Sequence, residues 1–420
     1  MLKKNLIFIF KNYAEIEYLA PIINDNENMF DILVFDYNKK SFLKNCPQLY
    51  EFLNEKKVKI YDTTDLLRNN FLIKLISNKI DARSPSIKSN LSYIILNLKF
   101  KIIFNFLLKT IFKLIYQFSF KNINFFKNYK KFLVGHRQLN KFFFRTFEKS
   151  FLKYLDNFIF IPHGPHYEKT IVSSESITNL EKVIIFSNKK YLNIIANYNE
   201  LPWKNNQYEK LNCAYLPYPL INYNLNNFNS KKIHKKNKKI LILLRTFNYF
   251  DNHNISKNEF SVSATEILNL LKVSYQEFYP KYDIYIKPHP ATNTNELRNL
   301  LISNNLNDLK FIHDPIFLTL CNFDFVISFK TTSIFLMVAN KIPVIFYNPE
   351  STKNYKMTHE FSKIYDSIAY YTSNNIDDLK TYFKCQTQFD PKKLIKNQEI
   401  IKDKFKVNKN FNTINDQEIL

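Results

Sequence analysis

Two short segments place a histidine where chemistry is expected. The first, IPHGPH, spans 161–166 and follows an apolar run. A neutral imidazole at the carboxyl end of a strand can take a proton from a hydroxyl nucleophile, because its reference pKa is about 6.5. Gly164 would let the backbone turn or approach a ligand closely. We therefore expect His163 to be functional, whereas a structural hydrogen bond to backbone explains His166 equally well.

The second histidine lies in Lys287-Pro288-His289-Pro290. The two prolines fix the backbone and pre-order the imidazole of His289. In extended geometry Lys287 and His289 point to the same side, where a cation and an imidazole suit a phosphate. Residues 292–296 are rich in helix-capping residues, so a helix N-terminus is expected next. The segment predicts a phosphate site, and an ordinary strand-to-helix loop is the alternative.

A third segment, Thr331-Thr332-Ser333, supplies three consecutive hydroxyls. It follows the predicted strand 324–328 and opens an apolar helix over 331–340. Hydroxyls and free backbone N–H groups at such a place bind anions. A simple N-cap is the alternative. Its place in the same predicted sheet as the 287–290 segment favours a phosphate site.

Two further basic positions follow predicted strands. Arg245 ends the predicted strand 239–245 and would contact a phosphate in the same cleft. Gly135-His136-Arg137 follows the apolar run 132–134, so His136 and Arg137 are candidates for the acceptor side. A solvated strand end is the alternative in both cases.

The elements that must position these residues are short apolar runs alternating with helical stretches. Such alternation predicts an α/β fold with parallel sheets. The expected strands include 6–10, 31–36, 57–61, 158–162, 183–187, 239–245, 282–290 (which ends in a turn), 309–313, 324–328 and 342–347. We expect an N-terminal acceptor-side domain over 1–225, a polar linker over 226–238, a donor domain over 239–375, and terminal helices and a tail over 376–420. Ligands in such sheets bind beyond the carboxyl ends of the strands, so we expect the candidates to line a central cleft.

Composition excludes several classes of protein. The chain has 420 residues and two glycines, where average usage of about 7% would give about 29. The two, Gly135 and Gly164, are 29 positions apart, so the chain can contain no dinucleotide-binding fingerprint, Walker A loop or nucleophile elbow, each of which needs closely spaced glycines. The four cysteines form no C-x-x-C pair, and no His/Asp/Glu cluster has metal-ligand spacing, so we expect no metal and no cofactor.

The formal net charge of +23 favours anionic partners. No nucleic-acid recognition module is visible, so we expect no nucleic-acid partner. Residues 87–121 are apolar and aromatic but interrupted by lysines, which argues against a transmembrane helix. This segment is expected to pack inside the N-terminal domain, and contact with an anionic membrane surface is its second candidate role.

The order of these motifs resembles a known group of enzymes. A strand followed by HG, a strand followed by KPHP, and FVISFKTTSIFLMVANKIPVIFY are similar to segments of GT-B transferases related to the CDP-glycerol glycerophosphotransferases of teichoic-acid synthesis. Capsule polysaccharide biosynthesis transferases are similar, and bacterial sialyltransferases share the HP and Ser/Thr motifs. The resemblance covers roughly 155–350. It implies a GT-B-like fold with two Rossmann-like domains.

The resemblance also implies roles for single residues. His163 resembles the histidine proposed as base for the acceptor hydroxyl, and His289 resembles the histidine that meets the donor phosphate. Thr331 and Thr332 resemble paired serines that hold the donor phosphates. Glycerophosphotransferases usually carry acids at the places where this chain has Phe329 and Leu336, which argues against glycerophosphate as the substrate.

Together these features predict a bacterial transferase of surface-polysaccharide synthesis, in the cytoplasm at the inner face of the membrane. It would move a sugar or polyol phosphate from a nucleotide-sugar or CDP-polyol donor to a glycan or lipid-linked acceptor. Two alternatives stay open. One is a non-catalytic polysaccharide-binding or assembly factor of the same fold, and the other is a nucleotide-sugar epimerase.

Overall fold

The computed structural model describes two compact units of the chain. The first comprises residues 1–219 with 408–420, and the second comprises 220–407. The described residues are 3–9, 13–34, 46–62, 65, 124–135, 158–161, 182–185, 213–215, 238–245, 262–289, 292, 294–329, 331, 333–349, 359–385 and 388–404.

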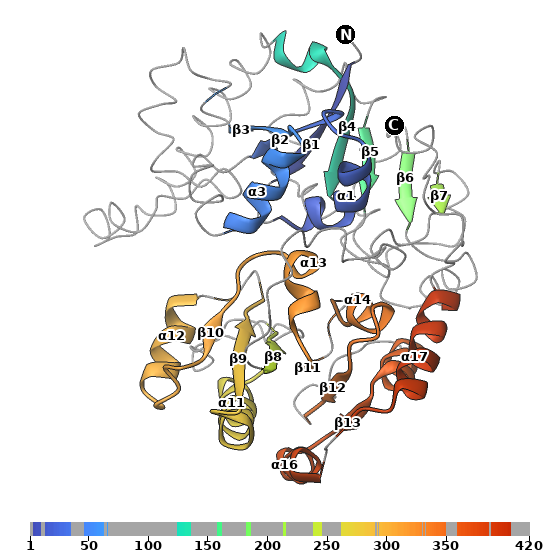
Figure 1. The fold of residues 1–420 in the computed structure, drawn as a ribbon. Coiled ribbons are helices and arrows are strands. Elements are labelled where there is room, and N and C mark those ends of the chain that lie inside the picture. The colour runs from blue at the N-terminus through green and yellow to red at the C-terminus, as the bar shows by residue number, and fades with distance from the viewer. Residues whose placement is uncertain are drawn as a thin grey trace, which may run out of the picture. The chain divides into compact units, whose positions relative to one another are not determined.

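The first unit is organised around a parallel sheet of seven described strands, in the order β3-β2-β1-β4-β5-β6-β7 (Figure 1). The strands are β1 Lys4–Ile9, β2 Phe30–Val34, β3 Lys59–Asp62, β4 Tyr129–Gly135, β5 Phe158–Ile161, β6 Lys182–Ile185 and β7 Cys213–Tyr215. The accompanying helices are α1 Ala14–Asp25, α3 Pro47–Glu55 and the short 3₁₀ helix η1 Asn124–Asn128. Strands β1 and β2 are almost wholly buried, which explains their continuous apolar sequences.

A buried carboxylate joins four strands of this sheet at their amino ends. Asp31 of β2 accepts hydrogen bonds from Lys4 Nζ of β1 at 3.0 Å, from the Tyr129 hydroxyl of β4 at 2.9 Å and from the Lys59 backbone N–H of β3 at 3.2 Å. Burial, and then the Asp31 charge and hydrogen bond, raise the pKa of Tyr129. The network fixes the register of these strands at their amino ends.

The second unit is built on a six-stranded parallel sheet in the order β10-β9-β8-β11-β12-β13. The strands are β8 Lys238–Leu243, β9 Tyr282–Lys287, β10 Lys310–Phe311, β11 Phe325–Ser328, β12 Val344–Tyr347 and β13 Tyr371–Ser373. The helices are α11 Ala264–Phe278, α12 Thr294–Ile302, α13 Ile316–Thr319, the 3₁₀ helix η8 Leu320–Asn322, α14 Ser333–Ala339, α15 His359–Ile368, α16 Ile376–Cys385 and α17 Pro391–Lys404.

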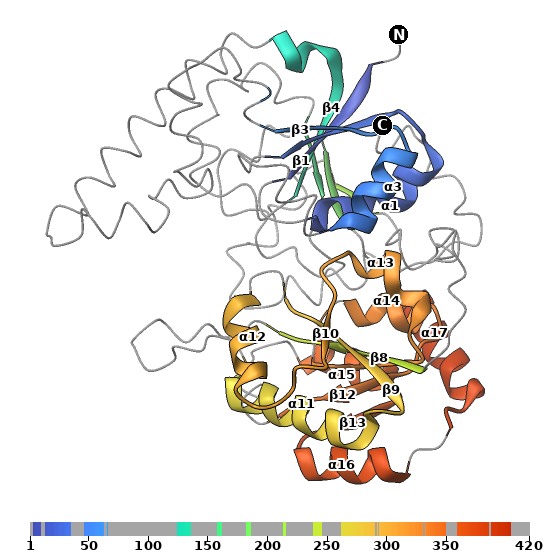
Figure 2. The ribbon, with the colours of Figure 1, turned by 60° about the vertical axis from the view of Figure 1, so that its left-hand side comes forward.

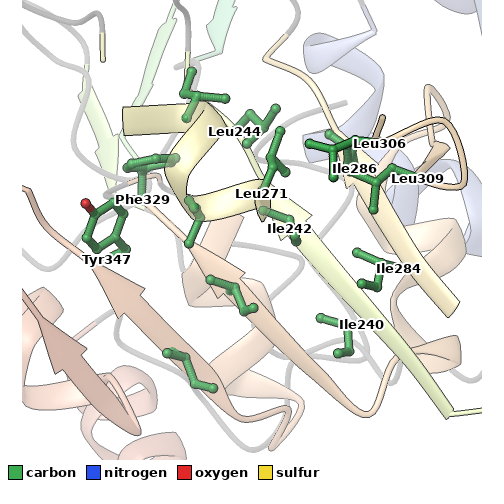
Figure 3. Close-up of a cluster of buried hydrophobic side chains, with 14 of the residues drawn as sticks. Ile240, Ile242, Leu244, Leu271, Ile284, Ile286, Leu306, Leu309, Phe329 and Tyr347 are labelled. Carbon is green, nitrogen blue, oxygen red and sulfur yellow. The ribbon is translucent and has the colours of Figure 1, made fainter. Parts of the chain in front are cut away.

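One face of this sheet packs against α11, α12 and α16 (Figure 2). Alternate residues of β8, including Ile240 and Ile242, point into that core, and Leu271 of α11 lies over them (Figure 3). Helix α11 begins with a capping box, in which the Ser263 hydroxyl accepts from the Glu266 N–H at 3.2 Å. Local capping and an apolar helix face therefore act together to place α11.

The opposite face is covered by α14 and α15, and α17 packs against these two helices. The Tyr365 ring of α15 stacks between Phe335 of α14 and Phe346 of β12, with centroid distances of 5.2 and 5.7 Å. Asn397 of α17 donates to the Ile368 carbonyl at 2.8 Å. These contacts make α17 part of the second unit, although its sequence is rich in lysine.

The α/β prediction is confirmed, because both units contain a parallel sheet whose described strands, apart from β7 and β13, overlap the predicted apolar runs. Strands β7 and β13 were not expected, since each has three residues. The two compact units divide between residues 219 and 220, whereas the linker predicted from the sequence covers 226–238. The central cleft stays a prediction, and segment 87–121 lies outside the described residues. Within the described part of the chain, no helix has the length and apolar character needed to cross a membrane.

Candidate anion site at the switch point of the second sheet

The strand order of the second unit defines where a ligand would bind. The chain enters the sheet at β8, moves outward through β9 and β10, and then returns to the other side of β8 with β11. Ligands of doubly wound sheets bind at this reversal, beyond the carboxyl ends of the two central strands. The reversal lies between β8 and β11, so the residues after Leu243 and Ser328 are the first candidates.

The strand register aligns the predicted site residues of three neighbouring strands. Leu243 of β8 pairs with Lys287 of β9 on one side and with Ser328 of β11 on the other. The pairing continues past the end of β8, because the Leu244 N–H donates to the Lys287 carbonyl at 3.0 Å. Arg245 follows Leu244 directly and is buried, with 9% of its surface exposed. The structure thus brings the predicted segments around 245, 287–289 and 331–333 to one edge of one sheet.

The sequence predicted that Lys287 and His289 face a phosphate together, but the structure gives the Lys287 side chain a different contact. Its side chain is buried, and Nζ donates to the Asp314 carbonyl at 2.6 Å. The bond ties the end of β9 to the loop after β10. Lys287 therefore has a structural contact of its own, and its direct contact with donor phosphate stays a prediction.

His289 lies in a tight turn at the end of β9. Its carbonyl accepts the Thr292 N–H at 2.8 Å, and its side chain is half-buried. The Thr292 hydroxyl oxygen is buried and has no hydrogen-bond partner among the described residues. The predicted helix then begins at Thr294, as α12. The turn fixes the direction in which the imidazole leaves the strand.

The hydroxyl segment lies after β11. Thr331 and Ser333 are half-buried, and the Thr331 carbonyl accepts the Ile334 N–H at 3.3 Å in the first turn of α14. The Ser328 hydroxyl is already used, since it donates to the Phe329 carbonyl at 2.6 Å. Thr331 and Ser333 are thus the described hydroxyl residues of the predicted segment, and Thr332 lies outside the described residues.

Phe329 and Leu336 occupy the places where the resembling transferases usually carry acids. Phe329 is fully buried and packs against the Tyr347 ring at a centroid distance of 5.6 Å. Leu336 is also buried. An acid at either place would lie in the hydrophobic core, so these two residues serve packing in this chain.

His313, which follows β10, was not among the site residues predicted from the sequence. Its ring stacks on Phe311 at a centroid distance of 6.1 Å and an interplanar angle of 10°. Burial lowers the pKa of His313, and the charges of Lys287 and Arg298 lower it further. The available signal was a histidine at the end of a predicted strand, the same placement that singled out His163 and His289.

The acceptor-side candidates of the first unit are not described. Strand β4 ends at Gly135 and β5 ends at Ile161. The candidates His136, Arg137, His163, Gly164 and His166 lie outside the described residues, so their roles stay predictions. Among the residues that the structure describes, no three His, Cys, Asp or Glu side chains come together as a metal site.

Comparisons with known proteins identify no family for this chain. No family model and no curated protein matches it. Among solved structures, S. aureus MnaA with UDP is 11% identical over 95% of this chain and 91% of that one, with a TM-score of 0.46. A variant of the wall teichoic acid polymerase TagF is 13% identical over 96% and 84%, with a TM-score of 0.47. Arabidopsis thaliana UGT89C1 with UDP is 10% identical over 97% and 96%, with a TM-score of 0.48. Values this low assign no activity to this chain.

Proposed function

We propose that this chain is a surface-polysaccharide transferase that moves a sugar or polyol phosphate from a nucleotide donor to a glycan or lipid-linked acceptor. The supporting observation is the alignment at the carboxyl edge of the second sheet. Arg245, His289 and the Thr331–Ser333 hydroxyls follow three adjacent strands, β8, β9 and β11. A permanent cation, an imidazole and hydroxyl groups at a switch point suit the phosphates of a nucleotide donor. The motif resemblance favours a cytidine nucleotide.

In the proposed reaction the acceptor hydroxyl attacks the donor directly. Its oxygen forms the new bond to the transferred group while the bond to the nucleotide phosphate breaks. His163 accepts the hydroxyl proton. His289, with Arg245 and the hydroxyl segment, stabilises the charge that develops on the leaving phosphate. Protein cations can neutralise this charge, so the proposal requires no metal or other cofactor.

We place the enzyme at the inner face of the cytoplasmic membrane, as a peripheral protein. The net charge of +23 supports attraction to acidic lipid or to a polyanionic acceptor. The lysines of segment 87–121 would provide part of this attraction. Nucleic acid is not a proposed partner.

A second candidate function follows from the two buried apolar residues. Phe329 and Leu336 replace acids of the resembling transferases and lie in the core. Loss of chemistry with retention of the fold would give a non-catalytic polysaccharide-binding or assembly factor. A nucleotide-sugar epimerase is the third candidate.

A donor screen separates these candidates. The purified full chain is incubated with CMP-, CDP-, UDP- and GDP-activated donors and a lipid-linked acceptor, and released nucleotide is measured. Acceptor-dependent release supports the transferase. Isomerised donor without acceptor supports the epimerase. If neither product forms and no nucleotide raises the melting temperature, the assembly factor is supported and the proposal is overturned.

A further inference from the structure

The second unit holds a group of basic side chains beside β10, and the proposed reaction gives no role to two of them, His313 and Arg298. The group consists of His313 after β10, Arg298 on α12 and Lys287 at the end of β9, and we call it the β10 cluster. Arg298 is exposed, His313 is half-buried and Lys287 is buried. The cluster therefore runs from the surface into the protein.

Ring stacking and one hydrogen bond fix the geometry of the β10 cluster. The Arg298 guanidinium lies 5.1 Å from the centroid of the Phe311 ring. The His313 ring is nearly parallel to the same Phe311 ring. The Lys287 bond to the Asp314 carbonyl anchors the residue next to His313. Imidazole and guanidinium are thus arranged around one aromatic ring before any ligand arrives.

Burial, and then the charges around His313, disfavour its protonation. Strand β9 contributes Lys287 and helix α12 contributes Arg298, while Asp314 on the same loop accepts the Lys287 bond through its carbonyl. Two cations around a half-buried imidazole are electrostatically unfavourable, and an anion placed among them would relieve the repulsion. The same anion would favour the charged form of the imidazole.

We propose that the β10 cluster binds an anionic group, through phosphate, sulfate or carboxylate oxygens, and that His313 takes up a proton when it binds. The inference does not depend on the proposed reaction. Strand β10 lies two strands from β8 and three from β11, or about 10 and about 14 Å across the sheet. His313 therefore lies away from the switch point, and Lys287 is the member of the cluster that adjoins β8. A substrate that used both places would carry a second anionic group.

Sulfate is a suitable probe, because its charge does not change between about pH 5 and about pH 8, where histidine titrates. The full chain is labelled with ¹⁵N-histidine, and the His313 signals are followed by NMR across this range, with and without sulfate. We expect sulfate to raise the pKa of His313 by about one unit. By linkage, sulfate would then bind up to about tenfold more tightly as the pH falls through the pKa of the free protein.

Two variants and one control sharpen the test. Removing the exposed cation in Arg298→Gln should raise the pKa of His313 in the free protein and weaken sulfate binding several-fold. His313→Gln should abolish the pH dependence of sulfate binding, measured by calorimetry. Lys396→Gln removes an equal charge from an exposed position on α17. It should change neither the pKa of His313 nor the affinity for sulfate. Thermal melting checks that each variant folds.

Two results would overturn the proposal. One is a His313 pKa that sulfate does not move. The other is sulfate binding that Arg298→Gln and Lys396→Gln weaken equally, which would indicate attraction to the net charge alone. Both readouts are independent of nucleotide turnover, so they distinguish failure of this site from failure of the proposed reaction.

Discussion

The ammonium group of Lys287 donates to the backbone carbonyl of Asp314 at 2.6 Å, and the bond is buried. It joins residues 27 positions apart and fixes the end of β9 to the loop after β10. This relationship gives Lys287 a positioning role beside two imidazoles, His289 in its own segment and His313 in the loop.

Replacing Lys287 with Met should therefore destabilise the second unit. The Asp314 carbonyl would lose its donor in a buried place, at a cost of about 1 to about 3 kcal/mol. Lys310→Met is the matched control, because Lys310 makes a surface pair with Asp283 at 2.8 Å and its side chain is 52% exposed. The control should cost less than about 1 kcal/mol. Urea denaturation measures both, and equal costs would contradict the positioning role.

The Asp31 network predicts a large loss of stability in the first unit. Asp31→Ala removes the acceptor shared by Lys4, Tyr129 and the Lys59 N–H, and leaves these donors at the buried end of the sheet. Breaking a buried ionic network by removing one member costs about 3 kcal/mol or more. Asp283→Ala, which breaks the exposed pair with Lys310, should cost less than about 1 kcal/mol. Thermal or urea unfolding distinguishes the two, and a mild Asp31 variant would show that the network contributes little.

The raised pKa of Tyr129 predicts a loss of stability at high pH. The folded state keeps this phenol protonated, whereas the unfolded chain ionises it above about pH 10. Its contribution is complete below pH 10 and declines as the pH rises further. At about pH 11 the wild type should have lost about 1.4 kcal/mol that Tyr129→Phe does not lose. Urea unfolding at about pH 8 and about pH 11 measures the difference, and parallel losses in both proteins would contradict it.

The salt dependence of binding to anionic vesicles tests the proposed membrane attachment. If the lysines of segment 87–121 hold the protein on acidic lipid, binding to anionic vesicles should weaken between about 10 mM and about 150 mM salt, as the Debye length shortens. Replacing Lys99, Lys101, Lys109 and Lys113 with Gln should remove most of that binding. Vesicle sedimentation measures it. Binding that ignores salt and these substitutions would argue against attachment through this segment.

The sequence predicted the elements well where strands are long and apolar. Runs such as 239–245 form strands because parallel strands covered on both faces are continuously hydrophobic. Strand β13, with the sequence YTS, lacks such a run and was missed. Helix α17 was expected in a terminal region, but Asn397 and the buried Ile401 attach it to the second unit. Lysine-rich composition alone does not show whether a helix packs.

The candidate site was predictable in part. The Lys287–His289 and Thr331–Ser333 segments were found because each follows a strand, and the sheet order places those strands beside β8. The partner of Lys287 was not predictable, because Asp314 contributes a backbone carbonyl that any residue would supply. His313 carried the same strand-end signal as His289, but its neighbours Arg298 and Lys287 come together with it only in the folded unit.

The most direct test of the central claim is nucleotide binding at the switch point of the second sheet. Calorimetry with CMP, CDP and UDP compares the wild type with His289→Ala, and Lys396→Ala serves as control. We predict that a cytidine nucleotide binds and that His289→Ala weakens its binding about tenfold to about hundredfold, with the melting temperature unchanged. Absence of binding by every nucleotide, or equal affinity in His289→Ala and the wild type, would contradict the account.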